Sequence, residues 1–299
     1  MNRINQLFQQ NPQNLLSLYF CAGAPTLEGT ADVIRTLEKN GISMIEIGVP
    51  FSDPMADGPV IQDAATKALR NGMSLRKLFE QLKDIRQDVK IPLILMGYLN
   101  PVIQFGFERF CQKCVEVGID GMILPDLPFA DYMEEYKPIA DKYDLRIIML
   151  ITPETSEERI RFIDENTDGF IYMVSSAAIT GAQKEFNEAK QAYFNKVHAM
   201  NLKHPTMIGF GISNRQTLQS AQANANGAII GSTFVQLLDA AKGDAQLAID
   251  QLYAALKEHR LDPYGLGPCL QRSEDPLPCQ LVIRGLQQLE RAAGRDRVG

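Results

Sequence analysis

The chain has 299 residues, of which 45% are hydrophobic, and carries a formal net charge of −6 at pH 7. This length is close to the roughly 250 residues of a β/α barrel, and the hydrophobic content supports a large core. The negative charge argues against nucleic acid or an anionic membrane as the main partner, because either would favour a basic surface. No apolar run approaches the roughly 20 residues that span a bilayer, and the N-terminus lacks a signal-peptide pattern, so we expect a cytoplasmic location.

Short apolar runs alternate with longer amphipathic segments through the first 260 residues. Near-continuous hydrophobicity in the short runs is typical of strands that are covered on both faces, as in parallel sheets. The segments between them have a helical period, and several begin at Ser, Thr or Asn. Eight strands are predicted, at residues 15–21, 43–49, 91–98, 121–125, 146–151, 169–174, 206–210 and 227–231.

Eight strands, each followed by a helix, predict an α/β fold, a (β/α)8 TIM barrel. An open doubly wound sheet would also alternate strands and helices, but eight regular units favour closure. The barrel is expected to form a catalytic domain over residues 1–260. Residues 261–299 are rich in Pro, Gly and Arg, and we expect an appended, poorly ordered tail there, with a small regulatory extension as the alternative.

Cys111 and Cys114 form a C-x-x-C pair, a spacing that also occurs in redox and zinc sites. They lie in a segment of helical period, on the face that carries the apolar residues, and no second pair or nearby histidine completes a metal set. We therefore expect both cysteines to lie in the core. The three histidines, His198, His204 and His259, form no metal triad by spacing, and no metal is expected.

Glu46 interrupts the apolar run at residues 43–49. Strand periodicity places it on the same face as Met44 and Gly48, while β-branched residues occupy the other face, which suits packing against outer helices. Glu46 is therefore expected to point into the barrel near the C-terminal end of its strand, where barrel active sites lie. Apolar surroundings should raise its pKa, as a group that exchanges protons near neutral pH requires.

The loop that follows, PFSDPMADGP at residues 50–59, is stiffened by three prolines and carries two aspartates. Asp57, eleven residues after Glu46, could lie over the mouth of the barrel and face that carboxylate. Alternatively, Asp57 caps a turn or a helix, as Asp-Gly pairs often do. The presence of Glu46 at the adjoining strand end favours a site with two carboxylates.

The segment EIGVPFSDPMADGPVIQ, residues 46–62, closely resembles the signature of tryptophan synthase alpha subunits over seventeen positions. The resemblance extends more loosely over residues 1 to about 260. It implies that Glu46 and Asp57 are the catalytic pair.

Two glycine-rich turns, GFGISN at 209–214 and GAIIGSTF at 227–234, follow the last two predicted strands. In barrels these loops commonly bind phosphate through backbone N–H groups and a helix N-terminus. Gly211 permits close approach of the backbone and Ser232 adds a hydroxyl, whereas structural turn glycines are the alternative for each loop alone. The resemblance implies a phosphate-binding barrel in which Gly181 and Gly231 complete this site.

Residues 175–189 are rich in small side chains and could form a lid. Thr180 and Gly181 match the family pattern G-V-T-G, and the resemblance implies that they bind substrate, but Ala178 replaces the first glycine of that pattern. Tyr172, on the strand before this segment, matches a family tyrosine near the catalytic carboxylates, with core packing as the alternative.

The resemblance implies a lyase of tryptophan biosynthesis, which cleaves indole-3-glycerol phosphate to indole and glyceraldehyde 3-phosphate in a retro-aldol reaction without a cofactor. It also implies an α2β2 heterotetramer in which Asp53, Pro54 and Pro128 contact the β subunit, the expected carrier of pyridoxal phosphate. Two alternatives stay open: another phosphate-binding barrel enzyme, such as a sugar-phosphate isomerase, or a catalytically silent activator of the β subunit.

Overall fold

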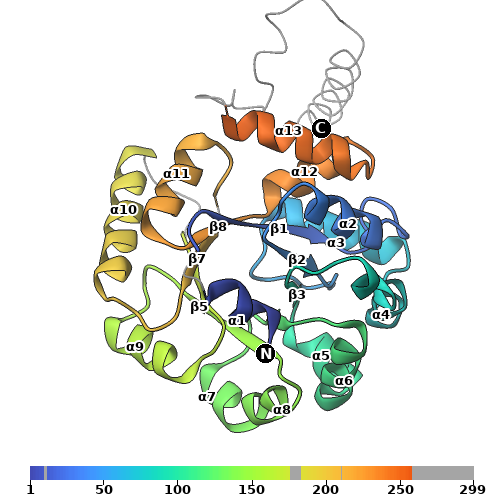
Figure 1. The fold of residues 1–299 in the computed structure, drawn as a ribbon, viewed down its shortest axis with the longest axis horizontal. Helices are drawn as coiled ribbons and strands as arrows, with labels where there is room; N and C mark the ends of the chain where they lie inside the picture. Colours follow the sequence, from blue (N-terminus) through green and yellow to red (C-terminus); the bar gives the residue numbers. More distant parts are fainter. Residues whose placement is uncertain (10–11, 176–182, 210, 258–299) are drawn as a thin grey trace, which may run out of the picture.

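A computed structural model of the chain describes residues 1–9, 12–175, 183–209 and 211–257. Within these residues, eight parallel strands form a closed barrel in the order β1 to β8, and helices surround it (Figure 1). The fold predicted from the alternation of strands and helices is thereby confirmed, and the open sheet is excluded. The predicted tail at residues 261–299 lies outside the described residues.

All eight predicted strands are present. They are β1 (Leu15–Cys21), β2 (Met44–Gly48), β3 (Leu93–Met96), β4 (Gly121–Ile123), β5 (Arg146–Ile151), β6 (Ile171–Val174), β7 (Thr206–Gly209) and β8 (Gly227–Ile230). β1 and β5 have the predicted bounds. Five of the others are shorter than predicted by one to four residues, and β7 is described up to Gly209, since residue 210 lies outside the described residues.

The helices begin where the sequence supplies a cap. The side chains of Ser74, Ser156 and Asn214 accept hydrogen bonds from the third backbone amide of α4, α9 and α11. The helical segments are α1 (Arg3–Phe8), α2 (Thr30–Lys39), α3 (Pro59–Arg70), α4 (Leu75–Leu82), η1 (Ile85–Gln87), α5 (Leu99–Phe105), α6 (Phe107–Val117), α7 (Phe129–Asp131), η2 (Tyr132–Tyr136), α8 (Lys137–Lys142), α9 (Glu157–Asn166), α10 (Gln183–Ala199), α11 (Arg215–Asn224), α12 (Ser232–Ala240) and α13 (Ala245–Lys257). None of the helices in this part of the chain is long and apolar enough to cross a membrane.

The barrel closes where β1 pairs with β8, with Leu15 opposite Gly227. A Cβ atom on Gly227 would lie 2.3 Å from the carbonyl oxygen of Leu15, so a larger residue would push the two strands apart. On its other side β1 pairs with β2, and there Tyr19 lies opposite Glu46. Closure therefore places β1 directly beside the predicted catalytic strand.

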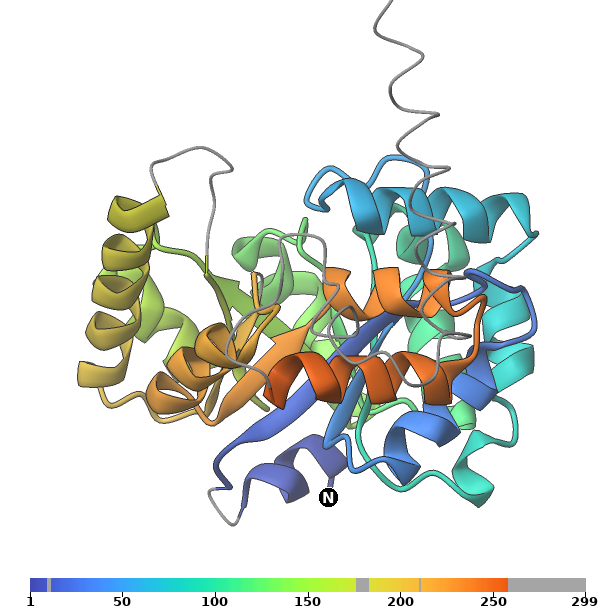
Figure 2. The same cartoon turned by 90° about the horizontal axis from the view of Figure 1, so that it is seen from above.

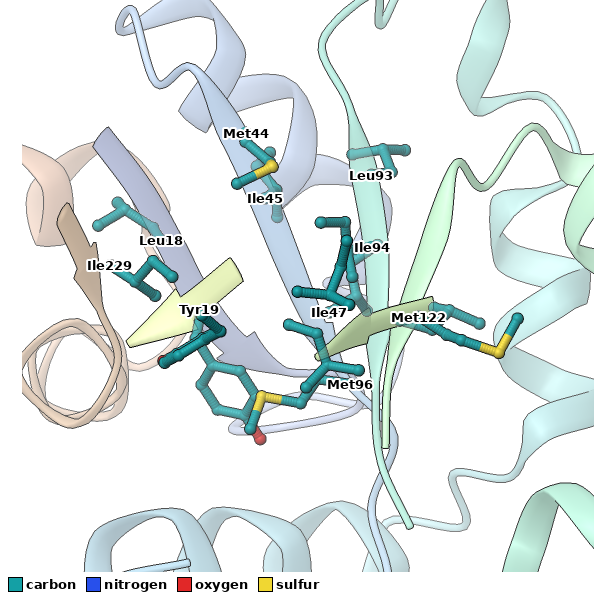
Figure 3. Packing of buried hydrophobic residues seen from close by; sticks show 14 of the residues in the cluster. Leu18, Tyr19, Met44, Ile45, Ile47, Leu93, Ile94, Met96, Met122 and Ile229 are labelled. Carbon is teal, nitrogen blue, oxygen red and sulfur yellow. The ribbon is translucent and has the colours of Figure 1, made fainter. Parts of the chain in front are cut away.

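Apolar side chains fill the space inside the barrel and between strands and helices. Figure 3 shows part of this core, with Leu18 of β1, Ile45 and Ile47 of β2 and Met122 of β4 among the buried side chains. Cys111 and Cys114 belong to the same core, and both lie on the fully buried face of α6. The prediction that these cysteines are core residues is thereby confirmed.

A buried ion network holds the N-terminal end of the barrel, where Figure 2 shows α1. The Asp120 carboxylate accepts hydrogen bonds from Arg86 at 2.6 Å, from Arg3 of α1 at 2.9 Å and from the Leu93 amide at 2.9 Å. Arg86 also donates to the carbonyl oxygens of Gly118 and Ile91. This network ties α1 to the bases of β3 and β4.

The Arg86→Ala substitution should therefore lower the free energy of unfolding by about 3–5 kcal/mol, because it leaves Asp120 buried with one cation fewer. The Arg35→Ala substitution is the matched control. It removes ion pairs at an exposed site and should cost less than about 1 kcal/mol. Urea unfolding followed by circular dichroism measures both, and equal losses would show that the Asp120 network adds no special stability.

Candidate active site

Glu46 lies on β2 and its side chain is fully buried. Its Oε1 atom accepts a hydrogen bond from the Ser17 hydroxyl of β1 at 3.1 Å, whereas Oε2 has no hydrogen-bond partner among the described residues. Burial raises the pKa of Glu46 to about 8, and the bond from Ser17 offsets part of that rise. A carboxyl group in this state can hold a proton at pH 7 and release it without a large free-energy cost.

Asp57 lies in the loop between β2 and α3, where its carboxylate is half-buried. Its Oδ2 atom accepts a hydrogen bond from the Tyr98 hydroxyl at 2.9 Å, and that hydroxyl accepts one from the Ala56 amide at 3.0 Å. Burial raises the pKa of Asp57, and the Tyr98 bond lowers it in part. The N-cap of α3 is Gly58, with no side-chain cap, so Asp57 does not cap this helix.

Two buried tyrosines, Tyr19 on β1 and Tyr172 on β6, share the barrel interior with Glu46. Burial raises the pKa of both phenols, and the nearby Glu46 and Asp57 carboxylates raise them further. Each ring covers a glycine on the next strand. Cβ atoms on Gly48 and Gly209 would lie 2.1 and 2.2 Å from the tyrosine hydroxyl oxygens. Those two glycines make room for the rings, so their role is in packing rather than in a turn.

A small cavity of about 10 Å³ adjoins Asp57 and has room for roughly one water molecule. In Figure 3 the Tyr19 ring and the Met96 side chain lie beside each other, and both line this cavity. The other lining residues are Val49, Phe51, Pro54, Ile61, Ala65, Gly97, Tyr98 and Pro125. A ligand larger than a water molecule therefore does not fit in this cavity as it stands.

The two glycine-rich loops lie together at the C-terminal end of the barrel. Gly211 has a φ of 75°, in the left-handed region that favours glycine. α12 begins at Ser232, directly after Gly231, and the first amides of a helix have no partner within it. The Thr233 hydroxyl donates to the carbonyl oxygen of Ile212 at 3.4 Å and so joins the two loops. The predicted residues Thr180 and Gly181 lie outside the described residues.

The predicted partner contacts also lie at this end of the barrel. Asp53 and Pro128 are exposed and Pro54 is half-buried, in the loops that follow β2 and β4. Met55, between Pro54 and Asp57, is 93% exposed. Met55 thus offers an apolar side chain to solvent in the same loop as Asp53 and Pro54.

Our sequence analysis missed four residues of this site: Ser17, Tyr19, Tyr98 and Lys190. Ser17 and Tyr19 alternate along β1 as inward-facing residues do, and Tyr98 follows β3 at the active end, so these positions carried a usable signal. Lys190 lies on α10, and the structure places its Nζ atom near Gly211, at 3.2 Å from where a Cβ would stand. No local pattern could have found that contact.

Comparison with known proteins gives consistent matches. The pattern of the family described as "Tryptophan synthase alpha chain" matches residues 4–265. The tryptophan synthase alpha chain of Phocaeicola vulgatus is 70% identical over 257 residues, which are 86% of this chain and 100% of that one. The solved structure of tryptophan synthase subunit alpha from Legionella pneumophila has a TM-score of 0.76 at 35% identity, over 85% of this chain and 97% of that one. For a tryptophan synthase complex from Pyrococcus furiosus the TM-score is 0.72 at 30% identity, over 83% and 98%.

The closed barrel of eight parallel strands, shared with the solved structure from Legionella pneumophila, defines a protein of the TIM barrel class. The chain belongs to the tryptophan synthase alpha chain family. It is a lyase, and its reaction is the cleavage of indole-3-glycerol phosphate in tryptophan biosynthesis. The sugar-phosphate isomerase and the silent activator are thereby set aside.

The buried Glu46 should make stability depend on pH. The folded chain keeps the Glu46 proton up to a pH of about 8, whereas the unfolded chain loses it above the ordinary pKa of 4.5, so stability falls as the pH rises between these values. The Glu46→Gln variant cannot titrate at this position. Its stability relative to the wild type should therefore grow by about 3 kcal/mol from pH 4 to pH 7.

Urea unfolding at several pH values measures this difference. The Glu28→Gln variant is the control, because Glu28 is exposed and its substitution should leave the pH dependence unchanged. A Glu46→Gln curve parallel to that of the wild type would mean that Glu46 is ionised in the folded chain at pH 7.

Proposed function

We propose that Glu46 is the acid–base group of the lyase reaction and that Asp57 is its electrostatic partner. The observation that carries this proposal is the fully buried Glu46 carboxyl, which has one oxygen held by Ser17 and the other without a partner among the described residues. Asp57 stands in a more open setting, beside a hydroxyl that stabilises its ionised form. Two carboxylates in such different environments are suited to two different roles.

The reaction begins with Glu46 protonated. Its carboxyl group donates the proton to C3 of the indole ring, and the positive charge that develops on the ring N–H is stabilised by the Asp57 carboxylate. The Glu46 carboxylate then accepts the proton of the glycerol hydroxyl next to the scissile bond. As that hydroxyl becomes the aldehyde of glyceraldehyde 3-phosphate, the C–C bond breaks and its electron pair returns to the ring, which leaves as indole. Glu46 ends protonated, ready for the next cycle.

The phosphate group of the substrate is bound, in this proposal, by the backbone around Gly211 and Gly231 and by Ser232. Support comes from the left-handed backbone at Gly211, the helix N-terminus at Ser232 and the hydrogen bond that joins the two loops. Thr180 and Gly181 would complete this site, and Tyr172 would border the ring of the substrate. Anchoring of the phosphate keeps the scissile bond near Glu46.

The activity of three variants tests the roles of the carboxylates. Glu46→Gln should lower kcat by about 10³-fold, because a general acid–base group typically contributes 10²–10⁴-fold. Asp57→Asn should lower kcat by roughly 10²-fold, through loss of the negative charge near the ring N–H. The exposed Asp32→Asn change is the control and should have no effect. Release of indole from indole-3-glycerol phosphate is the assay, and an active Glu46→Gln enzyme would overturn the proposal.

We also propose that the chain binds a tryptophan synthase β subunit through the loops that carry Asp53, Pro54 and Pro128. The exposure of these loops beside the mouth of the barrel supports this, as does the exposed Met55 side chain. Docking at this position would allow indole to pass from one active site to the other. Pyridoxal phosphate would belong to the β subunit, and the expected assembly is α2β2.

The Met55→Ser substitution should weaken β-subunit binding roughly tenfold, because it removes an apolar contact from the proposed interface. Leu247→Ser is the matched control, since Leu247 is an exposed apolar residue on α13, away from these loops. Titration of each variant with a β subunit, followed by light scattering or by stimulation of indole release, measures the affinity. Equal affinities for both variants would place the interface elsewhere.

A further inference from the structure

Ser17 is a buried hydroxyl inside the barrel, on β1 between the apolar residues Leu16 and Leu18. Its side chain is fully buried and donates to Glu46 Oε1 at 3.1 Å. A buried hydroxyl is unfavourable unless it forms a hydrogen bond, and Glu46 provides that bond.

A serine hydroxyl can either donate or accept a hydrogen bond, whereas a backbone N–H group can only donate. When Glu46 is ionised, Ser17 donates to it. When Glu46 carries a proton, the hydroxyl can turn and accept, so the contact survives both protonation states. A residue that must alternate between acid and base is best held by a partner of this kind.

We propose that Ser17 is a positioning residue, which holds the Glu46 carboxyl in one orientation throughout the proton cycle and leaves Oε2 facing the substrate. This inference rests on the proposed role of Glu46. The other titratable groups near this carboxyl are Tyr19 and Tyr172, and the Asp57 carboxylate acts on the same two phenols. Both phenols remain neutral near pH 8, because burial raises the pKa of each well above 10.

The Ser17→Ala variant tests this role through a readout that packing alone would not change. Glu46 must be protonated at the start, so kcat/KM of the wild type should fall above a pH of about 8. Loss of the Ser17 hydrogen bond raises the pKa of Glu46 further. The fall in kcat/KM should therefore occur at a higher pH in Ser17→Ala than in the wild type. We expect kcat at pH 7 to fall about tenfold, with KM unchanged.

Ser17→Thr keeps the hydroxyl, so its kcat/KM should fall at the same pH as in the wild type. Ser43→Ala is the control and should change neither value, because it removes a nearby hydroxyl that accepts from the Leu16 amide and not one that donates to Glu46. The inference would be overturned if a folded Ser17→Ala variant lost kcat/KM at the same pH as the wild type. If Ser17→Ala does not fold, Ser17→Cys, with a weak donor of similar size, must show the shift. A fully active Glu46→Gln enzyme would instead refute the proposed role of Glu46, so the two failures are distinguishable.

A second, independent observation concerns Lys190 on α10. Its Nζ atom lies 3.2 Å from the point where a Cβ on Gly211 would stand, and the Ser175 hydroxyl lies 3.9 Å from the same point. The side chain is half-buried, and this burial lowers the pKa of Lys190 from its usual 10.5. An ammonium group is therefore held beside the loop to which we assign the substrate phosphate.

We infer that Lys190 adds a cationic contact to the proposed phosphate site. Backbone amides offer only partial charges, whereas the ammonium group offers a full positive charge to a phosphate dianion. The contribution should appear in binding, because the phosphate carries the same charge before and after the C–C bond breaks.

Lys190→Gln should raise both KM and the inhibition constant of inorganic phosphate about tenfold, with kcat unchanged. Lys190→Arg should restore most of the loss. Lys196→Gln, on the same helix, is the control, since Lys196 is exposed and pairs with Glu157. An unchanged inhibition constant in Lys190→Gln would overturn the inference. If Ser232→Ala also leaves this constant unchanged, the proposed phosphate site itself is wrong.

Discussion

Pairing of β1 with β8 is the constraint on which the rest of this molecule depends. Once the sheet is closed, all eight parallel strands point their C-terminal ends to the same side. The loops after β2, β7 and β8 and the side chains of β1 and β6 then meet around one opening, although they come from distant parts of the sequence. The two strands can pair without a steric clash because Gly227 has no Cβ atom, which would lie 2.3 Å from the carbonyl oxygen of Leu15.

The burial of Glu46 inside the barrel has two effects: it raises the pKa of the carboxyl group and it lowers the stability of the fold near neutral pH. Glu46 is buried, and one of its oxygens has no hydrogen-bond partner in the described part of the chain, so an ionised carboxylate there is unfavourable. The carboxyl therefore holds its proton at pH values where an exposed glutamate would have lost it. That retained proton is what the acid–base role proposed for Glu46 requires, so the proposed reactivity and the cost to stability have one cause.

The polar groups at the two ends of the barrel differ in whether they have hydrogen-bond partners within the described residues. At the N-terminal end, Arg3 and Arg86 both donate to the buried Asp120 carboxylate, in a network that joins α1 to the strands. At the C-terminal end, polar groups such as Glu46 Oε2 are left without protein partners among the described residues and so can meet a substrate. Stability is concentrated at one end and chemical function at the other, as is general for this fold.

Local periodicity in the sequence was sufficient to predict the eight strands, the inward face of Glu46 and the buried face of α6, because each depends on the spacing of apolar residues along one segment. The segment at residues 46–62 was sufficient to indicate the family. Contacts between segments required the tertiary structure. Ser17 reaches Glu46 over 29 residues and Tyr98 reaches Asp57 over 41, and only closure of the barrel brings each pair within hydrogen-bond distance. Sequence alone thus indicated Glu46 and Asp57 as the candidate carboxylates. The fold decided which side chains form hydrogen bonds with them and how burial changes their pKa values.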